Sequence, residues 1–340
     1  MKTRRILAAI LGGAMVLSMA ACGSTGGSST AASAAAESTA ASAAASTAGK
    51  GNSDITIGVI LKTLSSEYWG YVAAGVKQAE KDLGIKVELQ GPPSETSYNE
   101  QSNMIETTIS AGKVDALVIS PLQPDMVVTK LQDATMPILF VDTDAKYDKK
   151  VAFVGTSNET AAKTGGEYIA KLIGKGKKAV LIGGVQGDTT CEARMKGYKE
   201  ALEANGIQVL GIQYANATAD KAVQVMENFM QTYPQIDAVL CNNDDMAMGA
   251  QRAAAQAGRA DKMKFMGFDG NATSVQSIID GKETASVAQS PYDMGYQAVA
   301  NAVKAVKGEK VEKNIIVETK LIDSSNAKEY LATLKKMSGK

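Results

Sequence analysis

From residue 54 onward, short β-branched runs alternate with amphipathic stretches of helical period, and the alternation is unusually regular. The run DITIGVIL predicts a strand, and the stretch from about Tyr68 to Leu83 predicts the helix that follows it. The other expected strands are IKVEL, DALVIS, PILFVD and VAFVG in a first round, and KAVLIGG, IQVLGI, DAVLC, KFMGFD and TASVAQ in a second. Strands that alternate with helices form parallel sheets covered by helices on both faces. Two consecutive rounds therefore predict two doubly wound parallel-sheet α/β lobes.

The last part of the chain adds a helix and one more extended segment. Pro291 suits the first turn of a helix that runs to about Val306, Ser290 can cap it, and Gly308 suits its exit. NIIVETKLI is expected as a last extended piece.

The first residues have the pattern of a secretory signal. A basic start is followed by an apolar segment and then by small residues before Cys22. The segment 1–21 resembles a bacterial lipoprotein signal peptide, which predicts a lipid anchor on Cys22; ordinary cleavage that leaves a free thiol is the alternative. From Gly23 to Gly49 every residue except Glu37 is Gly, Ser, Thr or Ala, so residues 22–53 are expected to form a flexible tether. The expected location is extracytoplasmic, on the outer face of the cytoplasmic membrane.

The composition excludes several classes of function. Lys plus Arg and Asp plus Glu both number 36, so no net field attracts nucleic acid. Histidine is absent, which argues against zinc enzymes and many hydrolases. Cys22, Cys191 and Cys241 lie far apart and form no CxxC pair; Cys191 and Cys241 would either pair or be small buried residues. GGVQGD lacks the lysine and the spacing of nucleotide-binding loops. We therefore expect no metal, no cofactor, no nucleic-acid partner and no enzymatic activity.

Polar and aromatic side chains gather where the expected strands end. In open parallel sheets, ligands bind at the carboxyl ends of the strands. A sugar hydroxyl both donates and accepts, so a sugar site needs carboxylates, amides and a guanidinium, together with aromatic faces against the C–H surfaces of the sugar. The strand ends offer all of these groups: Lys62, Ser66, Tyr68, Trp69, Ser120, Asp142, Thr143, Arg194, Asn243, Asp245, Asp269 and Gln289.

At these residues the chain resembles the periplasmic-type sugar-binding proteins of ABC transporters, of the ribose-binding kind. The resemblance runs from about Asp54 to Lys320, and its most specific parts are NNDDMAMGA followed by MGFDGN, ARMKGY, and VAQSPYDMG. It implies the type I periplasmic binding protein fold, in which two similar lobes close over one ligand. The lobes would be joined by three hinge crossings, near Thr156, Gln289 and Glu318.

The resemblance also implies ligand contacts, position by position. The residues that match the family's ligand-binding positions are Tyr68, Trp69, Asp142, Arg194, Asn243, Asp269 and Gln289. The weaker candidates are Lys62, Ser66, Ser120, Thr143 and Asp245. Each has a simpler alternative: the aromatic pair could pack in the core, Arg194 could lie on the surface, and the aspartates could cap helices. Asp244 and Asp245 are expected mainly to cap the helix that they begin.

The chain departs from the ribose-type pattern in ways that make ribose itself doubtful. Thr143 stands where an Arg commonly follows the Asp, and Ala217 where an aromatic residue is often found. Ser66 and Ser120 replace amides. Lys62 replaces a small hydroxyl residue, so it would point to a phosphorylated or acidic sugar if it faces the cleft, or else lie along the surface.

The sequence thus predicts a monomeric, lipid-anchored receptor that captures a monosaccharide or polyol and delivers it to a membrane permease and its ATPase subunits. The expected lobes are residues 54–156 with 290–318, and residues 157–289 with 319–340. A ligand-sensing domain that presents a sugar-like signal to a membrane receptor is the alternative.

Overall fold

The structure is a computed structural model that describes residues 51–337, with side chains to residue 335. The expected signal peptide at 1–21, the lipidation site at Cys22 and nearly all of the expected tether lie outside the described residues. The described chain begins with a short 3-10 helix, η1 (Asn52–Asp54). No helix within 51–337 is both long and apolar enough to cross a membrane.

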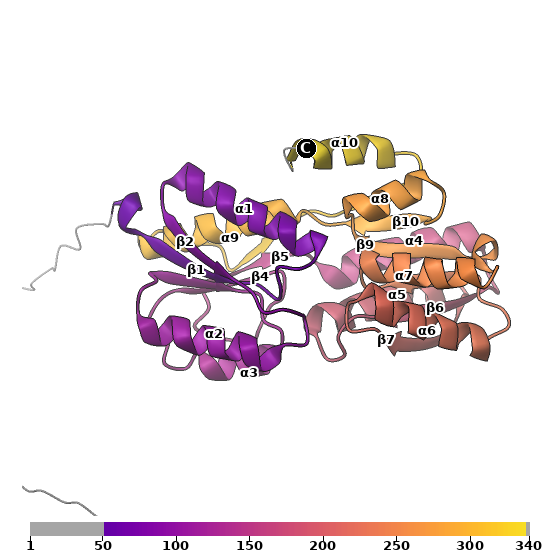
Figure 1. The fold of residues 1–340 in the computed structure, drawn as a ribbon, viewed down its shortest axis with the longest axis horizontal. Coiled ribbons are helices and arrows are strands. Elements are labelled where there is room, and N and C mark those ends of the chain that lie inside the picture. The colour runs from indigo at the N-terminus through magenta and orange to yellow at the C-terminus, as the bar shows by residue number, and fades with distance from the viewer. Residues whose placement is uncertain (1–50, 338–340) are drawn as a thin grey trace, which may run out of the picture. The chain divides into compact units, whose positions relative to one another are not determined.

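The first sheet has six parallel strands in the order β11-β5-β4-β3-β1-β2. Figure 1 shows this sheet with β1, β2, β4 and β5 labelled. Its strands are β1 (Thr56–Ile60), β2 (Lys86–Gln90), β3 (Ala116–Ile119), β4 (Ile138–Val141), β5 (Ala152–Gly155) and β11 (Asn314–Ile316). Its helices are α1 (Glu67–Leu83), α2 (Tyr98–Ala111), α3 (Pro124–Lys130) and α9 (Pro291–Val306). One apolar cluster joins α1 and α9 to one face of the sheet, and a second joins α2 and α3 to the other. The sheet is therefore covered on both sides, and its central strands are apolar along their whole length because neither face meets water.

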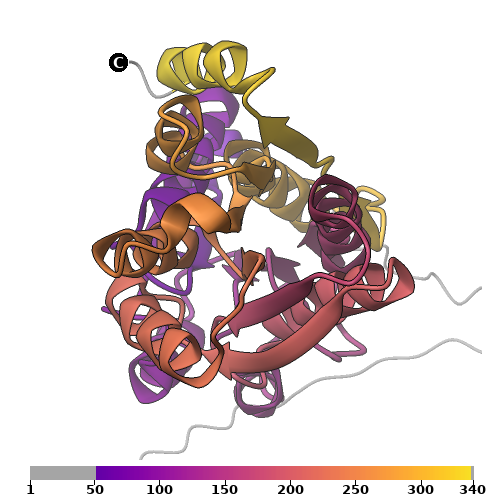
Figure 2. The ribbon, with the colours of Figure 1, turned by 90° about the vertical axis from the view of Figure 1, so that its right-hand side faces the viewer.

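The second sheet repeats this arrangement in the order β12-β10-β9-β8-β6-β7. Its strands are β6 (Lys178–Gly183), β7 (Gln208–Tyr214), β8 (Ala238–Cys241), β9 (Lys264–Asp269), β10 (Ala285–Ala288) and β12 (Lys320–Asp323). The associated helices are α4 (Asn158–Ile173), α5 (Thr189–Ala204), α6 (Ala219–Thr232), α7 (Asp244–Gln256), η2 (Ala260–Lys262), α8 (Ala272–Ile279) and α10 (Ala327–Met337). Figure 2 shows helices on both sides of this sheet. Separate apolar clusters hold α4 and α5 to one face, α6 and α7 to the other, and α8 and α10 beside the sheet's edge.

The predicted fold class, two doubly wound α/β lobes, is confirmed. The chain passes between the sheets three times: after β5, after β10, and between β11 and β12. The exact residue boundaries that the sequence predicted for the lobes stay a prediction.

The last extended segment, NIIVETKLI, is divided between the two sheets. β11 joins the first sheet and β12 joins the second. β12 also runs antiparallel to β10, so the second sheet is not purely parallel. The segment changes sheets within a few residues, and β12 therefore arrives at the edge of the second sheet from the end opposite to the other strands.

Candidate functional site

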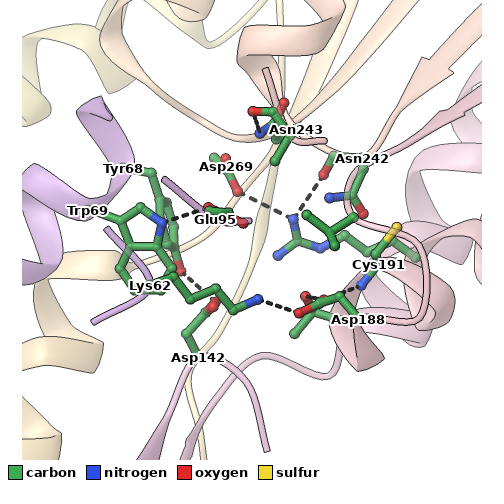
Figure 3. Close-up of a pocket in the computed structure, with 14 residues that line it drawn as sticks. Lys62, Tyr68, Trp69, Glu95, Asp142, Asp188, Cys191, Asn242, Asn243 and Asp269 are labelled. Atoms are coloured by element: carbon green, nitrogen blue, oxygen red, sulfur yellow. Dashed lines mark hydrogen bonds and ion pairs between the residues drawn. The ribbon is translucent and has the colours of Figure 1, made fainter. Parts of the chain in front are cut away.

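A polar pocket lies where the carboxyl ends of strands from both sheets meet (Figure 3). Its free interior volume is about 30 Å³, so the side chains around it leave room for little more than water. The residues that line it are Lys62, Tyr68, Trp69, Glu95, Asp142, Val185, Asp188, Thr190, Cys191, Arg194, Ala217, Asn242, Asn243 and Asp269. Seven of the twelve residues predicted from the strand ends are among them.

Arg194 is held rigidly on one side of the pocket. It projects from α5 and is only 4% exposed, so the surface alternative is wrong for it. Its Nε donates to Asn158 Oδ1 at 2.8 Å, and its Nη1 donates to the Asn242 carbonyl at 2.9 Å. The guanidinium carbon lies 3.7 Å from the centre of the Phe268 ring, a cation–π arrangement. Two hydrogen bonds and one stacked face fix the planar donor group in a single orientation.

Asp269 ends β9 and lies 3.5 Å from Arg194 Nη1. Gln289 does not line the pocket; its Nε2 donates to Asp269 Oδ1 at 2.8 Å, and its Oε1 accepts from the Thr156 hydroxyl at 2.7 Å. Gln289 therefore orients Asp269 from behind. Burial raises the pKa of Asp269, although the neighbouring Arg194 charge opposes this shift.

Asp142 directly follows β4 and enters the pocket from the first sheet. Its Oδ2 accepts from the Tyr68 hydroxyl at 3.3 Å, and its Oδ1 accepts from the Thr143 hydroxyl at 3.2 Å. Burial raises the pKa of Asp142, and the charges of Lys62 and Arg194 oppose the rise. Neither Asp142 nor Asp269 caps a helix; both have positive φ, at 64° and 118°. Non-glycine residues adopt such backbone angles at a cost, and these costs are concentrated at functional sites.

Tyr68 and Trp69 lie in the first turn of α1 and meet edge to face, with ring centroids 5.1 Å apart. Both belong to the apolar cluster under α1, and both also line the pocket, so the core and pocket interpretations hold together. The indole Nε1 of Trp69 donates to Glu95 Oε1 at 2.8 Å. Glu95 comes from the loop between β2 and α2.

Lys62 is buried in the pocket and does not lie along the surface. Its Nζ donates a hydrogen bond to Oδ2 of Asp188, and the two side chains form an ion pair. Asp188 is the N-cap residue of α5, so this ion pair joins the two lobes. Burial alone would lower the pKa of Lys62, but the charges of Asp188, Glu95 and Asp142 outweigh it and the pKa is raised. Burial would raise the pKa of Asp188, but the Lys62 charge and the hydrogen bonds from Lys62, the Thr190 hydroxyl and the Cys191 amide together outweigh it, so the pKa is lowered.

Asn243 and Asp244, which follow β8, have roles that differ from the predicted ones. Asn243, which lines the pocket, is itself the N-cap of α7: its Oδ1 accepts from the Met246 amide at 2.9 Å. Asp244 caps nothing; it is fully buried and accepts from the Ser286 hydroxyl at 2.6 Å and the Asn271 amide at 2.7 Å. The expectation that Asp244 caps the helix was wrong, because the amide one position earlier already fills that place.

The weaker candidates mostly lie outside the pocket. Ser66 caps α1 by accepting from the Trp69 amide at 3.3 Å. Thr143 supports Asp142, and Asp245, on the first turn of α7, does not line the pocket. Ser120 is fully buried, and its hydroxyl has no partner within the described part of the chain.

Several lining residues were not predicted: Glu95, Val185, Asp188, Thr190, Cys191, Ala217 and Asn242. The sequence could have indicated Asp188, because an Asp between a predicted strand and a predicted helix is a common N-cap. Cys191 and Cys241 are free and buried, so the disulfide alternative is wrong. Between residues 51 and 337 no group of three or more His, Cys, Asp or Glu side chains is placed to hold a metal ion.

The chain is similar to known sugar-binding proteins in sequence and in fold. The periplasmic binding protein domain model matches residues 57–310. The chain is 32% identical to the ribose import binding protein of Escherichia coli (strain K12), over 78% of this chain and 90% of that protein. It is 33% identical to the D-allose-binding periplasmic protein of the same organism, over 78% and 89%. A solute binding protein of an ABC transporter from Bacillus halodurans, solved with bound myo-inositol, aligns with a TM-score of 0.75 at 27% identity, covering 83% of this chain and 98% of that one.

Proposed function

Because this chain belongs to the periplasmic binding protein family, and its relatives are sugar-binding components of ABC importers, we propose that it captures a monosaccharide or related polyol in the pocket between its lobes. These relatives are binding proteins rather than enzymes, in agreement with the prediction from the sequence.

The observation that carries the proposal is the convergence of Arg194, Asp269, Asp142 and Asn243 beside the Tyr68–Trp69 pair. A planar donor fork, two carboxylates and an amide match hydroxyl groups that donate and accept, while the aromatic pair offers apolar surface to the ring. In this proposal Gln289 and Thr143 act behind the pocket by orienting the two aspartates.

The ligand is bound by hinge closure, since residues of both lobes line the same pocket. Contacts that join the lobes support this part of the proposal. Besides the Lys62–Asp188 pair, Glu67 on α1 accepts from the Ala272 amide and the Thr273 hydroxyl on α8, both at 2.8 Å. Only a closed form can make these bonds, and a ligand that touches both lobes favours that form.

We further propose that the protein lies outside the cytoplasm and acts as a monomer. Cleavage after residue 21 leaves Cys22 to carry the lipid, and residues 22–53 form the tether. The lobes comprise residues 54–156 with 290–318 and residues 157–289 with 319–340, and the closed form delivers its sugar to a membrane permease driven by ATPase subunits. Mass spectrometry of protein extracted from membranes tests the anchor: a diacylglyceryl mass on Cys22 is expected, and its absence contradicts this part.

The binding proposal is tested by isothermal titration of the purified body, residues 51–340, with pentoses, hexoses and inositols. At least one compound is expected to bind with micromolar or tighter affinity and to raise the melting temperature. Arg194→Lys keeps the positive charge but loses the planar set of guanidinium donors, and it is expected to weaken that binding at least tenfold. If no neutral or charged sugar gives heat or a shift in melting temperature, the proposal fails.

A further inference from the structure

The pocket contains more negative than positive groups. Four carboxylates line it, from Glu95, Asp142, Asp188 and Asp269, whereas Lys62 and Arg194 are the cationic residues in the lining. Each cation is already engaged: Lys62 with Asp188, and Arg194 with Asp269. The excess of negative charge therefore lies on Asp142 and Glu95.

Asp142 and Glu95 have no cationic group within ion-pair distance in the part of the chain that the structure describes. The hydrogen bonds that they accept come from neutral donors, the hydroxyls of Tyr68 and Thr143 for Asp142 and the indole N–H of Trp69 for Glu95. Burial raises the pKa of both carboxyl groups, and the Lys62 charge only partly offsets it. Asp142 is buried and Glu95 is half-buried. A carboxylate removed from water without a cation is costly, and a ligand that supplies the cation reduces that cost.

A further acceptor in the lining is also unsatisfied. Asn242 is 7% exposed and lines the pocket, and its Oδ1 has no hydrogen-bond partner among residues 51–337. A buried carbonyl oxygen without a donor is unfavourable, so a ligand group that donates a hydrogen bond to Asn242 Oδ1 would be favoured at this position. The lining as a whole thus offers more acceptors than donors.

Lys62 does not make the pocket suitable for an anion. Its ammonium is neutralised by Asp188, and Glu95 and Asp142 also act on it electrostatically. A phosphate or carboxylate of a ligand would have to compete with Asp188 for Lys62 while lying near two uncompensated carboxylates. The idea that Lys62 selects a phosphorylated or acidic sugar, which the sequence suggested, therefore loses its basis.

We propose that the pocket prefers a polyol carrying an amino group, an amino sugar or an aminocyclitol, whose ammonium is bound by Asp142 and Glu95. An ammonium donates three hydrogen bonds and accepts none, which suits a lining rich in acceptors. Charge-assisted hydrogen bonds of this kind are roughly twice as strong as neutral ones. The inference rests on the proposed function, since it names the ligand class of the same site.

Matched ligands provide the test. Titration calorimetry at pH 7 compares glucose with glucosamine, galactose with galactosamine, and myo-inositol with its monoamino analogues, together with N-acetylglucosamine, glucose 6-phosphate and glucuronate. In at least one pair the amine is expected to bind about tenfold tighter than its neutral counterpart, and N-acetylation, which removes the charge, is expected to abolish that advantage. The two anionic sugars are expected not to bind.

Variants of single carboxylates test whether Glu95 causes the preference for an amine. Glu95→Gln is expected to reduce the ratio of amine to neutral affinity at least fivefold, whereas Glu106→Gln, at an exposed carboxylate paired with Lys130, leaves the ratio unchanged. Neutral sugars that bind as tightly as their amines, or a bound sugar phosphate, would overturn the inference and leave the proposed function intact. Failure of every compound would remove both. If Glu95→Gln does not fold, the wild-type ratios decide.

Discussion

At the scale of single residues, Arg194 and Asp269 form the most consequential pair. Both are almost fully buried, and Arg194 also lies against Phe268. Removing one partner of a buried pair leaves the other charge uncompensated, which typically costs about 3–5 kcal/mol. Arg194→Met is therefore expected to lower the free energy of unfolding by an amount in this range, measured by urea denaturation.

The double variant Arg194→Met with Asp269→Asn shows whether the uncompensated charge is the cause. It is expected to be clearly less destabilised than the sum of the two single changes. Arg252→Met, at an exposed pair with Asp220, serves as the control and should change stability by no more than about 0.5 kcal/mol. Additive single effects would refute the uncompensated-charge account.

Residues at strand ends could be predicted from the sequence, and residues in loops could not. Asp142, Asn243 and Asp269 follow or end apolar runs, and the ends of parallel strands meet at one edge of a sheet. Glu95 lies in the loop after β2, whose course depends on contacts such as the one with Trp69 rather than on any local pattern. Gln289 was placed at the site, but its position behind Asp269 follows from side-chain geometry that the sequence does not encode locally.

At the scale of secondary structure, helices α1 and α9 cross closely because each has a glycine at the contact. A Cβ added to Gly75 would lie 1.9 Å from the Tyr292 carbonyl oxygen, and one added to Gly295 would lie 2.1 Å from the Val72 carbonyl oxygen. Since the obstacle is backbone in both cases, the helices would have to move apart. Gly75→Ala is expected to destabilise the protein by about 1–3 kcal/mol or more, measured by urea denaturation.

The same helix supplies the control for this prediction. Gly70 lies in α1 and is exposed, and an added Cβ would meet nothing within 4 Å. Gly70→Ala is therefore expected to stabilise the protein by about 0.5–1 kcal/mol, through the higher helix propensity of alanine. Equal effects at both positions would show that propensity, and not the close crossing, decides the cost.

The elements themselves could be predicted because their signals are local. Apolar runs such as ALVI and ILFV became β3 and β4, and both are buried along their whole length. The local pattern of NIIVETKLI does not show its division between two sheets, because its two halves have similar patterns and differ only in the sheet whose edge they meet. A crossing near Glu318 was implied by the family resemblance alone.

At the scale of the whole molecule, Glu67 connects the two lobes outside the pocket. Its carboxylate accepts from the Ala272 amide at the start of α8 and from the Thr273 hydroxyl, each at 2.8 Å. If these bonds stabilise the closed form, Glu67→Ala shifts the protein toward the open form and weakens ligand binding by the same factor. A three- to tenfold rise in Kd is expected, with a larger radius of gyration in X-ray scattering without ligand. Glu100→Gln, at an exposed position on α2, should change neither quantity.

The pH dependence of stability is also a property of the whole molecule, since buried carboxyl groups in both lobes contribute to it. Burial raises the pKa of Asp142 in the first lobe, and of Asp244 and Asp269 in the second. Burial also raises the pKa of Glu283, from 4.5 to about 8, against hydrogen bonds that include one from the Ser274 hydroxyl at 2.8 Å. The folded protein therefore keeps protons on these groups up to a higher pH than the unfolded chain does.

The sign of the effect follows from these proton numbers. Between pH 4.5 and about 8, Glu283 is protonated in the folded state and ionised in the unfolded state, so its contribution to stability is full below pH 4.5 and is lost as the pH rises through 8. The pKa of Asp188 is shifted downward, so its contribution changes only in more acidic solution and does not oppose this decline. Urea midpoints are expected to fall from pH 5 to pH 8 and to fall less steeply in Glu283→Gln, which cannot ionise. A variant profile parallel to that of the wild type would mean that Glu283 titrates normally in the folded protein.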